Sequence, residues 1–223
     1  MIHRIFILSF LTVSLALSRA EGQQVTVRWE ADFHQTLKSN EPVVGPDPYR
    51  VEVLKFYVSG LSLYKGDRQV FSEPSPLLID LTDSARTTPL LSAVSGDFDR
   101  VDFQLGIDST TNAQGVLGGD LDPTNGMYWT WQSGYINFKL EASSRQIGGQ
   151  KGLQYHLGGY RQPFNALRTV SLKVDGPNAV IVFNSRSFLT SLPANLPDKI
   201  MSPGLEACTV ADHAADAFKT HRP

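Results

Sequence analysis

The sequence predicts an all-β protein: an antiparallel β-sandwich or barrel of about nine strands with one C-terminal helix. Two observations lead to this prediction. Short segments of alternating apolar and polar residues recur along the chain, and 18 glycines and 13 prolines supply turn residues between them. After the last of these segments, apolar residues recur at the spacing of a helix instead of a strand.

The first twenty residues have the pattern of a secretory signal peptide. A basic start at 1–4 precedes an apolar run at 5–17, and Ser18-Arg19-Ala20 has the small residues of a cleavage site. The apolar run is too short for a membrane-spanning helix. We therefore expect residues 1–20 to be removed and residues 21–223 to form a single β-rich domain that is periplasmic or secreted.

Charge and cysteine content exclude several classes of protein. The chain carries 20 Lys and Arg against 22 Asp and Glu, and removal of the predicted signal peptide makes the net charge more negative. It therefore lacks the basic surface that binds nucleic acid or anionic lipid. The single cysteine, Cys208, can form no internal disulfide, although an exposed thiol would permit a linked dimer. The fold must rest on its hydrophobic core or on a metal.

The predicted strands follow from alternation. Residues 25–33 alternate, so their odd-numbered members share one face of a strand. Residues 51–64 predict a longer strand with a bulge at Ser59-Gly60, followed by a hairpin turn at 65–68. The same alternation predicts further strands at 69–71, 77–81, 101–107, 135–140, 153–157, 169–174 and 179–184.

The C-terminal segment differs from the rest. Apolar residues between Gly204 and Lys219 fall at helical spacing and predict one amphipathic helix, over about 203–219, packed on the sheet. Cys208 is expected on or near its buried face. His213 stands beside acidic residues and is expected on the solvated face. Five residues separate the two, which is a poor spacing for a shared metal site, so a structural role is predicted for both.

A stretch rich in aromatic residues, 118–141, is the part of the chain most suited to a site. It contains two of the three tryptophans, Trp129 and Trp131, beside Met127 and Tyr128. The two tryptophans are two positions apart, so on an extended chain they point to the same face. On composition alone, filling the core is the favoured role for both indoles.

Motifs of common enzymes are absent from the sequence. It has no nucleophile elbow, no zinc-protease helix motif, no Cys-x-x-Cys and no phosphate loop, and we expect no catalytic residues. Asp120 and Asp122, with Asn125-Gly126, resemble part of a calcium loop. The spacing is off by one, however, and Trp131 stands where a glutamate ligand belongs. These residues are sufficient as turn formers.

Histidines are the remaining candidates for chemistry. Besides His213 and the near-terminal His221, His34 follows the first strand and His156 lies on a late strand. Imidazole and soft sulfur ligands suit copper, and a site with two or three ligands suits Cu(I) better than hard cations. Spacing alone does not show that His34 and His156 meet.

Several segments together resemble the MbnP family of exported copper-binding proteins, which is related to the MopE and CorA proteins of methanotrophs. The resemblance covers about 25–183. It is strongest at Gly119-Asp120-Leu121-Asp122-Pro123, Gly126-Met127-Tyr128-Trp129-Thr130-Trp131-Gln132-Ser133-Gly134-Tyr135-Ile136 and Tyr155-His156-Leu157-Gly158, and it includes Phe33-His34, 54–63 and 101–108.

This resemblance implies a non-enzymatic, β-rich protein that stores or transfers Cu(I). It implies His34 and His156 as copper ligands, with Asp32 as a candidate hydrogen-bond partner. It also implies that Trp129 or Trp131 is oxidised to kynurenine by a dihaem, peroxidase-like partner of the MbnH type. Met127 is either a soft ligand or a packing neighbour.

Two other classes of function stay open at this point. A carbohydrate-binding or adhesion module would use the Trp129/Trp131 aromatic platform for stacking. A secreted enzyme of unrecognised type would use His156 as a base.

Overall fold

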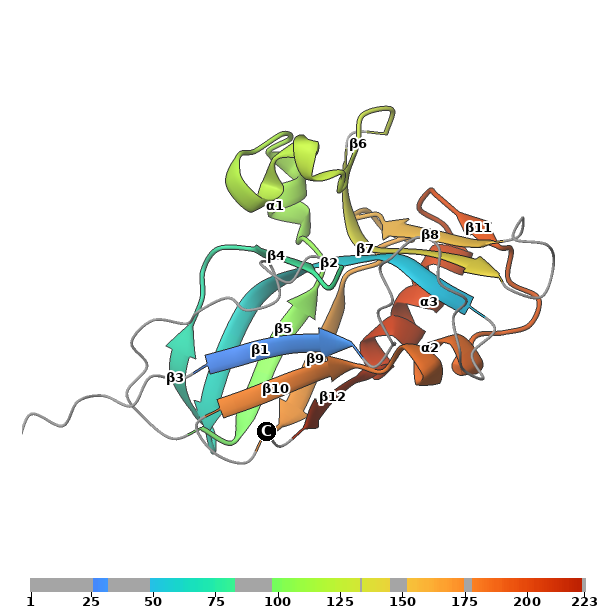
Figure 1. The fold of residues 1–223 in the computed structure, drawn as a ribbon. Coiled ribbons are helices and arrows are strands. Elements are labelled where there is room, and N and C mark those ends of the chain that lie inside the picture. The colour runs from blue at the N-terminus through green and yellow to red at the C-terminus, as the bar shows by residue number, and fades with distance from the viewer. Residues whose placement is uncertain are drawn as a thin grey trace, which may run out of the picture.

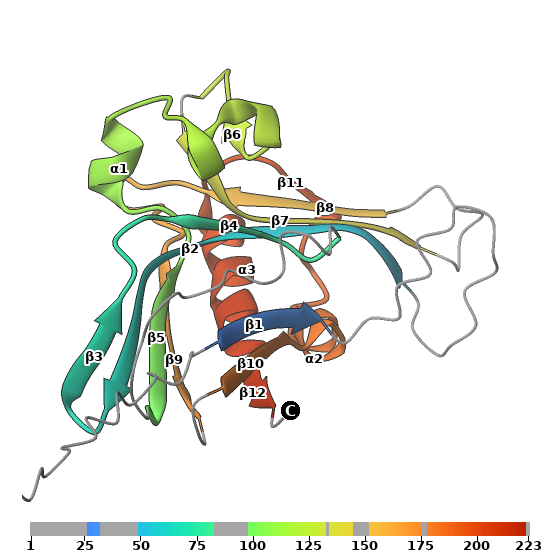
Figure 2. The same cartoon turned by 60° about the vertical axis from the view of Figure 1, so that its left-hand side comes forward.

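The computed structural model describes residues 26–31, 49–82, 98–132, 134–144, 152–174 and 178–221. These residues form a mostly β protein in which a curled sheet of nine strands makes a half-barrel (Figure 1). A second sheet of three strands and the longest described helix lie within the concave side of this half-barrel (Figure 2). The predicted β-rich class is thus confirmed.

The large sheet has the central order β11-β8-β7-β2-β5-β9, with β3, β4 and β6 paired at its margins, and the small sheet has the order β1-β10-β12. The described elements are β1 (Thr26–Ala31), β2 (Tyr49–Lys65), β3 (Arg68–Ser72), β4 (Leu77–Asp80), β5 (Arg100–Leu105), α1 (Ser109–Ala113), the 3-10 turns η2 (Gly119–Leu121) and η3 (Pro123–Asn125), β6 (Tyr128–Trp129), β7 (Gly134–Ser144), β8 (Gly152–Gly158), β9 (Arg168–Lys173), β10 (Asn178–Phe183), α2 (Ser185–Ser191), β11 (Lys199–Ile200), α3 (Leu205–Asp216) and β12 (Phe218–His221).

Strand pairing differs from the predicted, wholly antiparallel arrangement. Most neighbours are antiparallel, but β1 pairs with β10 and β11 pairs with β8 in parallel. Both parallel pairs join segments that are distant in sequence. Local alternation identifies a strand, but it carries no information about the direction of a distant partner.

The long strand β2 gives the large sheet its curl. It has 17 residues, and it pairs with β7 along its first part and with β5 along its second. The register shifts between Ser59 and Ser62, and Gly60 has a φ of 58°. A bulge of this kind bends a strand and increases its twist. The predicted bulge and the hairpin turn from Lys65 to Arg68 are confirmed.

Aromatic rings fill the space between the two sheets. Val27 and Trp29 of β1 are buried, whereas Arg28 and Glu30 are exposed, as the alternation predicts. The Trp29 indole makes edge-to-face contacts with Phe56 and Phe103, at 5.7 and 5.0 Å between ring centroids. Such contacts add to the free energy gained by burying the rings.

The C-terminal helix is present, but it ends before Lys219. Helix α3 spans Leu205–Asp216 and buries Ala207, Val210, Ala211 and Ala214. The chain then enters β12, where Phe218 pairs with Phe183. Burial of the Phe218 ring in the aromatic core outweighs continuation of the helical spacing. Among the described helices, none is both long and apolar enough to cross a membrane.

Phe218 is therefore predicted to be essential for stability. Its ring lies 5.2–6.2 Å, between centroids, from four other aromatic rings, those of Trp29, Phe56, Phe103 and Phe183. Phe218→Ala should lower the free energy of unfolding by about 3–5 kcal/mol in urea denaturation, because it leaves a cavity in a packed core. Phe164→Ala, at a ring that is 41% exposed, is the matched control and should cost less than about 1 kcal/mol. Equal losses in the two variants would contradict this view of the core.

Candidate functional site

A second apolar cluster covers the convex face of the large sheet. The segment carrying α1, η2, η3 and β6 stands over β7 and β2, on the side away from β1 and β10 (Figure 1). The buried members of the cluster are Tyr57, Leu78, Ile107, Leu121, Met127, Trp129, Tyr135 and Ile136. We call this the outer cluster. Most of the aromatic stretch singled out in the sequence is thus used to cover the back of the sheet.

Aspartates hold the turns of this segment. The Asp122 carboxylate accepts a hydrogen bond from the Thr124 amide at 2.8 Å and caps η3, and Gly126 ends this turn in the left-handed region. Asp120 Oδ2 accepts from the Leu78 amide of β4 at 2.8 Å. The predicted role of these residues as turn formers is confirmed, and each hydrogen bond ties the segment to itself or to the sheet.

One edge of the Trp129 indole packs against Gly158 of β8. It is only 4% exposed, and a Cβ atom built on Gly158 would lie 2.7 Å from its Cζ3 atom. Only a glycine at position 158 therefore leaves room for the indole. The Nε1 of Trp129 is buried and, within the described part of the chain, has no hydrogen-bond partner. The same is true of Trp29 in the apolar core between the two sheets, which we call the inner core.

Trp131 has a different environment. Strand β6 ends at Trp129 and residues 130–132 turn, so Trp131 is 65% exposed. Its ring still lies 5.7 Å from that of Trp129, between centroids, at an angle of 44°. The sequence prediction that both indoles share a face assumed an extended chain. With one ring buried and the two tilted, the pair does not form a flat exposed platform.

His156 lies on β8, on the convex face of the sheet. Its neighbours Tyr155 and Leu157 point into the inner core, so the imidazole points the other way. It is 7% exposed, and its Nε2 lies 2.8 Å from Oε1 of Glu141 on β7. Glu141 was not predicted from the sequence. The available signal was its place at the end of the alternating strand, two residues after Lys139.

Burial controls the protonation of this pair. Burial lowers the pKa of His156 below its ordinary value of 6.5; the hydrogen bond to Glu141 opposes this shift, and Lys139 and Lys199 add to it. Burial acts to raise the pKa of Glu141, but hydrogen bonds from His156 and Lys139 hold it below its ordinary value. The pair is therefore a neutral imidazole that donates its Nε2 proton to a carboxylate, with Nδ1 left as an electron-pair donor.

His156 and Trp129 lie on the same face of the sheet. Gly158, which contacts the Trp129 indole, is two residues from His156 along β8, and alternate residues of a strand share a face about 7 Å apart. Two of the residues predicted for the site thus share this face. Trp131 adjoins them through its contact with Trp129.

The structure describes some of the other predicted residues and not all of them. His34 and Asp32 are outside the described residues. Met127 is completely buried within the outer cluster. In α3, His213 Nδ1 lies 3.0 Å from Ser191 Oγ, and Cys208 Sγ lies 3.6 Å from the carbonyl oxygen of Asn165. Across the described ranges, no three His, Cys, Asp or Glu residues lie close enough together to hold a metal ion.

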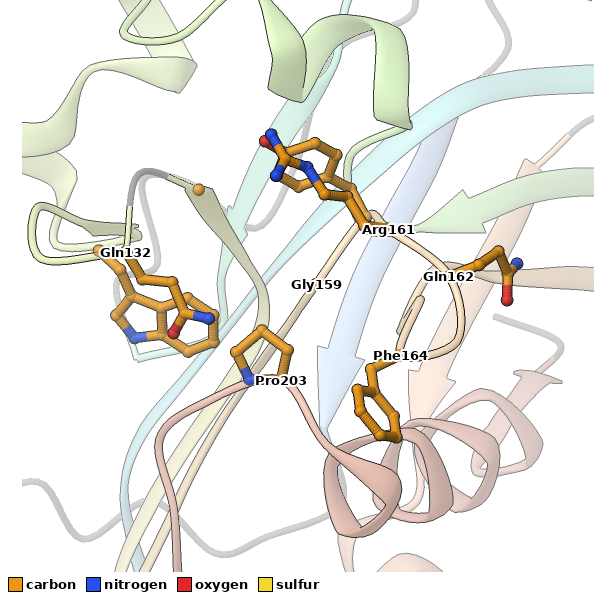
Figure 3. A pocket seen from close by; sticks show the side chains of 9 residues that line it. Gln132, Gly159, Arg161, Gln162, Phe164 and Pro203 are labelled. Carbon is orange, nitrogen blue, oxygen red and sulfur yellow. The ribbon is translucent and has the colours of Figure 1, made fainter.

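A pocket of about 290 Å³ adjoins Trp129, which forms part of its wall. Gln132 lies on one side of Gly159 and Phe164 on the other, with Pro203 between them and Arg161 above (Figure 3). This pocket could not be predicted from the sequence, because its walls come from three separate segments that only the fold brings together.

Comparisons with known proteins identify the fold. The family model described as MbnP matches residues 22–202. A solved structure, MbnP from Methylosinus trichosporium, resembles this chain with a TM-score of 0.56 at 15% sequence identity, over 90% of this chain and 95% of that one. No curated protein matches the chain.

The contact between Gly158 and Trp129 gives a prediction about packing. In Gly158→Ala the new methyl group would meet both the indole and the carbonyl oxygen of Tyr135, at 2.6–2.7 Å. We expect a changed near-ultraviolet circular dichroism spectrum and a loss of about 1–3 kcal/mol in the free energy of unfolding. Gly118→Ala is the control, because no atom lies within 4 Å of its added Cβ. An unchanged spectrum in Gly158→Ala would contradict the indole's position.

The lowered pKa of His156 predicts acid sensitivity. The unfolded chain binds a proton more readily than the folded one, so this residue's contribution to stability is complete above its ordinary pKa of 6.5 and is lost as pH falls below it. Urea denaturation of metal-free protein should show stability falling below about pH 6.5. His156→Gln, which retains a hydrogen-bond donor for Glu141, should reduce this slope. If the stability of His156→Gln and that of the wild type fall equally with pH, the acid sensitivity does not come from His156. The contribution of Glu141 is lost only below its ordinary value of 4.5, so the two effects separate.

Proposed function

The chain belongs to the MbnP family, and we propose that it is an exported copper-binding protein that stores or transfers Cu(I). Support for export comes from the signal-peptide pattern of residues 1–20. Support for copper comes from the family and from one observation above all. A buried, neutral imidazole, His156, is fixed through Nε2 by a carboxylate and has Nδ1 left to donate.

This imidazole is suited to copper. Metal-binding histidines in general donate one ring N–H to a carboxylate or carbonyl, which fixes the tautomer and makes the other nitrogen a better donor. Cu(I) accepts imidazole and soft ligands at low coordination number, so one or two further donors complete its site. When bound, copper adds a redox-active, soft Lewis-acidic centre to a protein that has no assigned catalytic residue.

We propose His34 as the second ligand. It belongs to the segment that joins β1 to β2, and β2 begins with Tyr49 paired to Ser144 of β7. Strand β7 is also the strand that carries Glu141 beside His156. Strand β2, which follows this segment in the chain, therefore begins on a neighbour of the strand that holds His156.

A tryptophan is the third element of the proposal. We propose that a dihaem, MbnH-type partner oxidises Trp129 or Trp131 to kynurenine. Two molecules of hydrogen peroxide would each deliver one oxygen atom and leave one molecule of water, so that the C2–C3 bond of the indole breaks and both carbons become carbonyls. Hydrolysis by one water molecule would then release C2 as formate. Trp129 is supported by its closeness to His156, and its opened ring would carry an aryl amine. Trp131 is supported by its exposure, which admits a protein oxidant.

Copper binding by His34 and His156 is tested by substitution. His34→Ala and His156→Ala should each weaken Cu(I) binding by about 100-fold in a competition assay with a Cu(I) chelator, because each removes a donor from a site with few ligands. His213→Ala is the matched control, since its imidazole lies near Ser191 on α3 and should leave affinity unchanged. Wild-type affinity in the double variant His34→Ala/His156→Ala would exclude this ligand set.

The oxidation is tested on protein purified from its native exported fraction. Intact mass should show one carbon atom replaced by one oxygen atom, and peptide mapping should place the change at Trp129 or Trp131. Protein made without the partner should retain both indoles. Native protein that contains copper but has two intact indoles would retain the binding role and remove the oxidation from the proposal.

A further inference from the structure

The pocket beside Trp129 is held open by a rigid loop. The loop from Gly159 to Ala166 is closed by a hydrogen bond at 3.0 Å from the Ala166 amide to the Gly159 carbonyl oxygen. At its base, the Arg168 guanidinium donates to the carbonyl oxygens of Asn165 and Cys208, at 2.8 and 3.0 Å, and pairs with Asp212. These contacts anchor the loop to α3, so its exposed side chains are presented on a fixed frame, which lowers the entropic cost of binding a ligand.

Glycine keeps the floor of the pocket clear. Gly159 has a φ of 110°, and a Cβ built on it would lie 2.3 Å from the carbonyl oxygen of Phe164 and 3.0 Å from Pro203 Cβ. Only glycine is compatible with both this backbone angle and this close approach. The loop, the β6–β7 turn and Pro203, two residues before α3, can therefore converge around one space (Figure 3).

The charge of the pocket favours an anion. Arg161 carries the only formal charge among the described residues that line it. Its guanidinium lies 5.2 Å from the centroid of the Tyr160 ring, and no other described residue forms a hydrogen bond or ion pair with it. Gln132 adds an exposed amide, whereas the Gln162 side chain points away from Arg161 (Figure 3). A guanidinium with amide donors and no competing acid matches a carboxylate, which an arginine can bind through two hydrogen bonds.

The walls favour a flat apolar group. Trp129, Tyr160 and Phe164 bring three aromatic rings to the pocket, and Phe164 is 41% exposed. Rings at such walls pack best against another ring, by stacking or by edge-to-face contact. A volume of about 290 Å³ lies at the lower end of the range for ligand pockets, so it suits one ring but not a large cofactor.

We propose that this pocket binds a small organic anion in which a single flat ring carries a carboxylate. The carboxylate meets Arg161, and the ring lies between Phe164 and Trp129. The pocket shares Trp129 with the proposed copper site, but neither His156 nor Glu141 lines it. Binding of the anion requires no metal and stands or falls separately from the copper function.

Two probes of the same shape and different charge test the proposal. 4-Hydroxybenzoate and its neutral counterpart 4-hydroxybenzamide are titrated by calorimetry into the full, metal-free mature chain. We expect the benzoate to bind about tenfold or more tightly than the benzamide, since a hydrogen bond to a charged partner contributes about 1.5–3 kcal/mol. No measurable binding of the benzoate at millimolar concentration, or equal binding of the two probes, would overturn the proposal.

Variants locate the interaction. Arg161→Gln should reduce benzoate affinity about tenfold, to that of the benzamide, and leave the benzamide unchanged. Arg68→Gln, on β3, also removes an exposed arginine and should leave the affinity for both probes unchanged. Phe164→Ala should weaken both probes equally. His156→Ala should leave benzoate affinity at the wild-type value, which separates this test from the copper test. Full benzoate affinity in Arg161→Gln would refute the site.

The carbohydrate-binding class is addressed with the same assay. Methyl glycosides carry no charge and should bind no more tightly than the benzamide. A methyl glycoside that binds Arg161→Gln and wild type alike, and more tightly than benzoate, would overturn the anion proposal and favour the saccharide class.

Discussion

The requirement that the large sheet bury apolar side chains on both of its faces determines much of this structure. Along β7, Phe138 points into the inner core while Ile136 points into the outer cluster. A register shift between them, opposite β8, accommodates Asn137, which is 2% exposed. The Asn137 side chain accepts a hydrogen bond from the Ile107 amide at 3.0 Å, so the bulge also anchors the segment that covers the convex face. Without that segment, the apolar residues of this face would be left in water.

The convex face changes from apolar to charged along the same strands. Beyond the outer cluster it carries a row of charged side chains, in which Lys55 pairs with Asp80 at 2.9 Å and Lys139 pairs with Glu141 at 3.3 Å. His156 and Trp129 lie at the boundary between these two regions. At such a boundary an imidazole is buried deeply enough to stay neutral, yet it still has a carboxylate within reach. This combination supports a role in binding a soft cation, and the sequence alone does not reveal it.

Local features of the fold were predictable from the sequence. The alternation of β1, the bulge at Gly60, the hairpin at Gly66 and the helix near Cys208 each depend on a few consecutive residues. The parallel pairings and β12 depend on partners far along the chain. Phe218 lies in a strand because its ring packs in the aromatic core, although the spacing around it is that of a helix. The burial of Trp129 and the exposure of Trp131 depend on where a two-residue strand ends, which no periodicity indicates.

The candidate site was predictable in part and for the same reason. His156 and Trp129 were identified from their residue types and from a family resemblance, whereas Glu141 required the register of β7 against β8. Arg161 and Phe164 were not identified, because each looks like an ordinary loop residue until the fold places it beside Trp129. Chemistry that depends on residue type can be inferred from a sequence, but a cavity formed by three segments requires coordinates.

The position of β12 has a consequence for the order in which the protein completes its fold. Phe218 is the ring that meets Trp29 and Phe56, and β12 is the last described strand of the chain. A ribosome releases residues from the N-terminus onward, so the aromatic core lacks this ring until residue 218 has been made. Contacts between the two ends of a sequence form slowly, since a long loop must close first. Completion of the aromatic core is therefore delayed by connectivity alone.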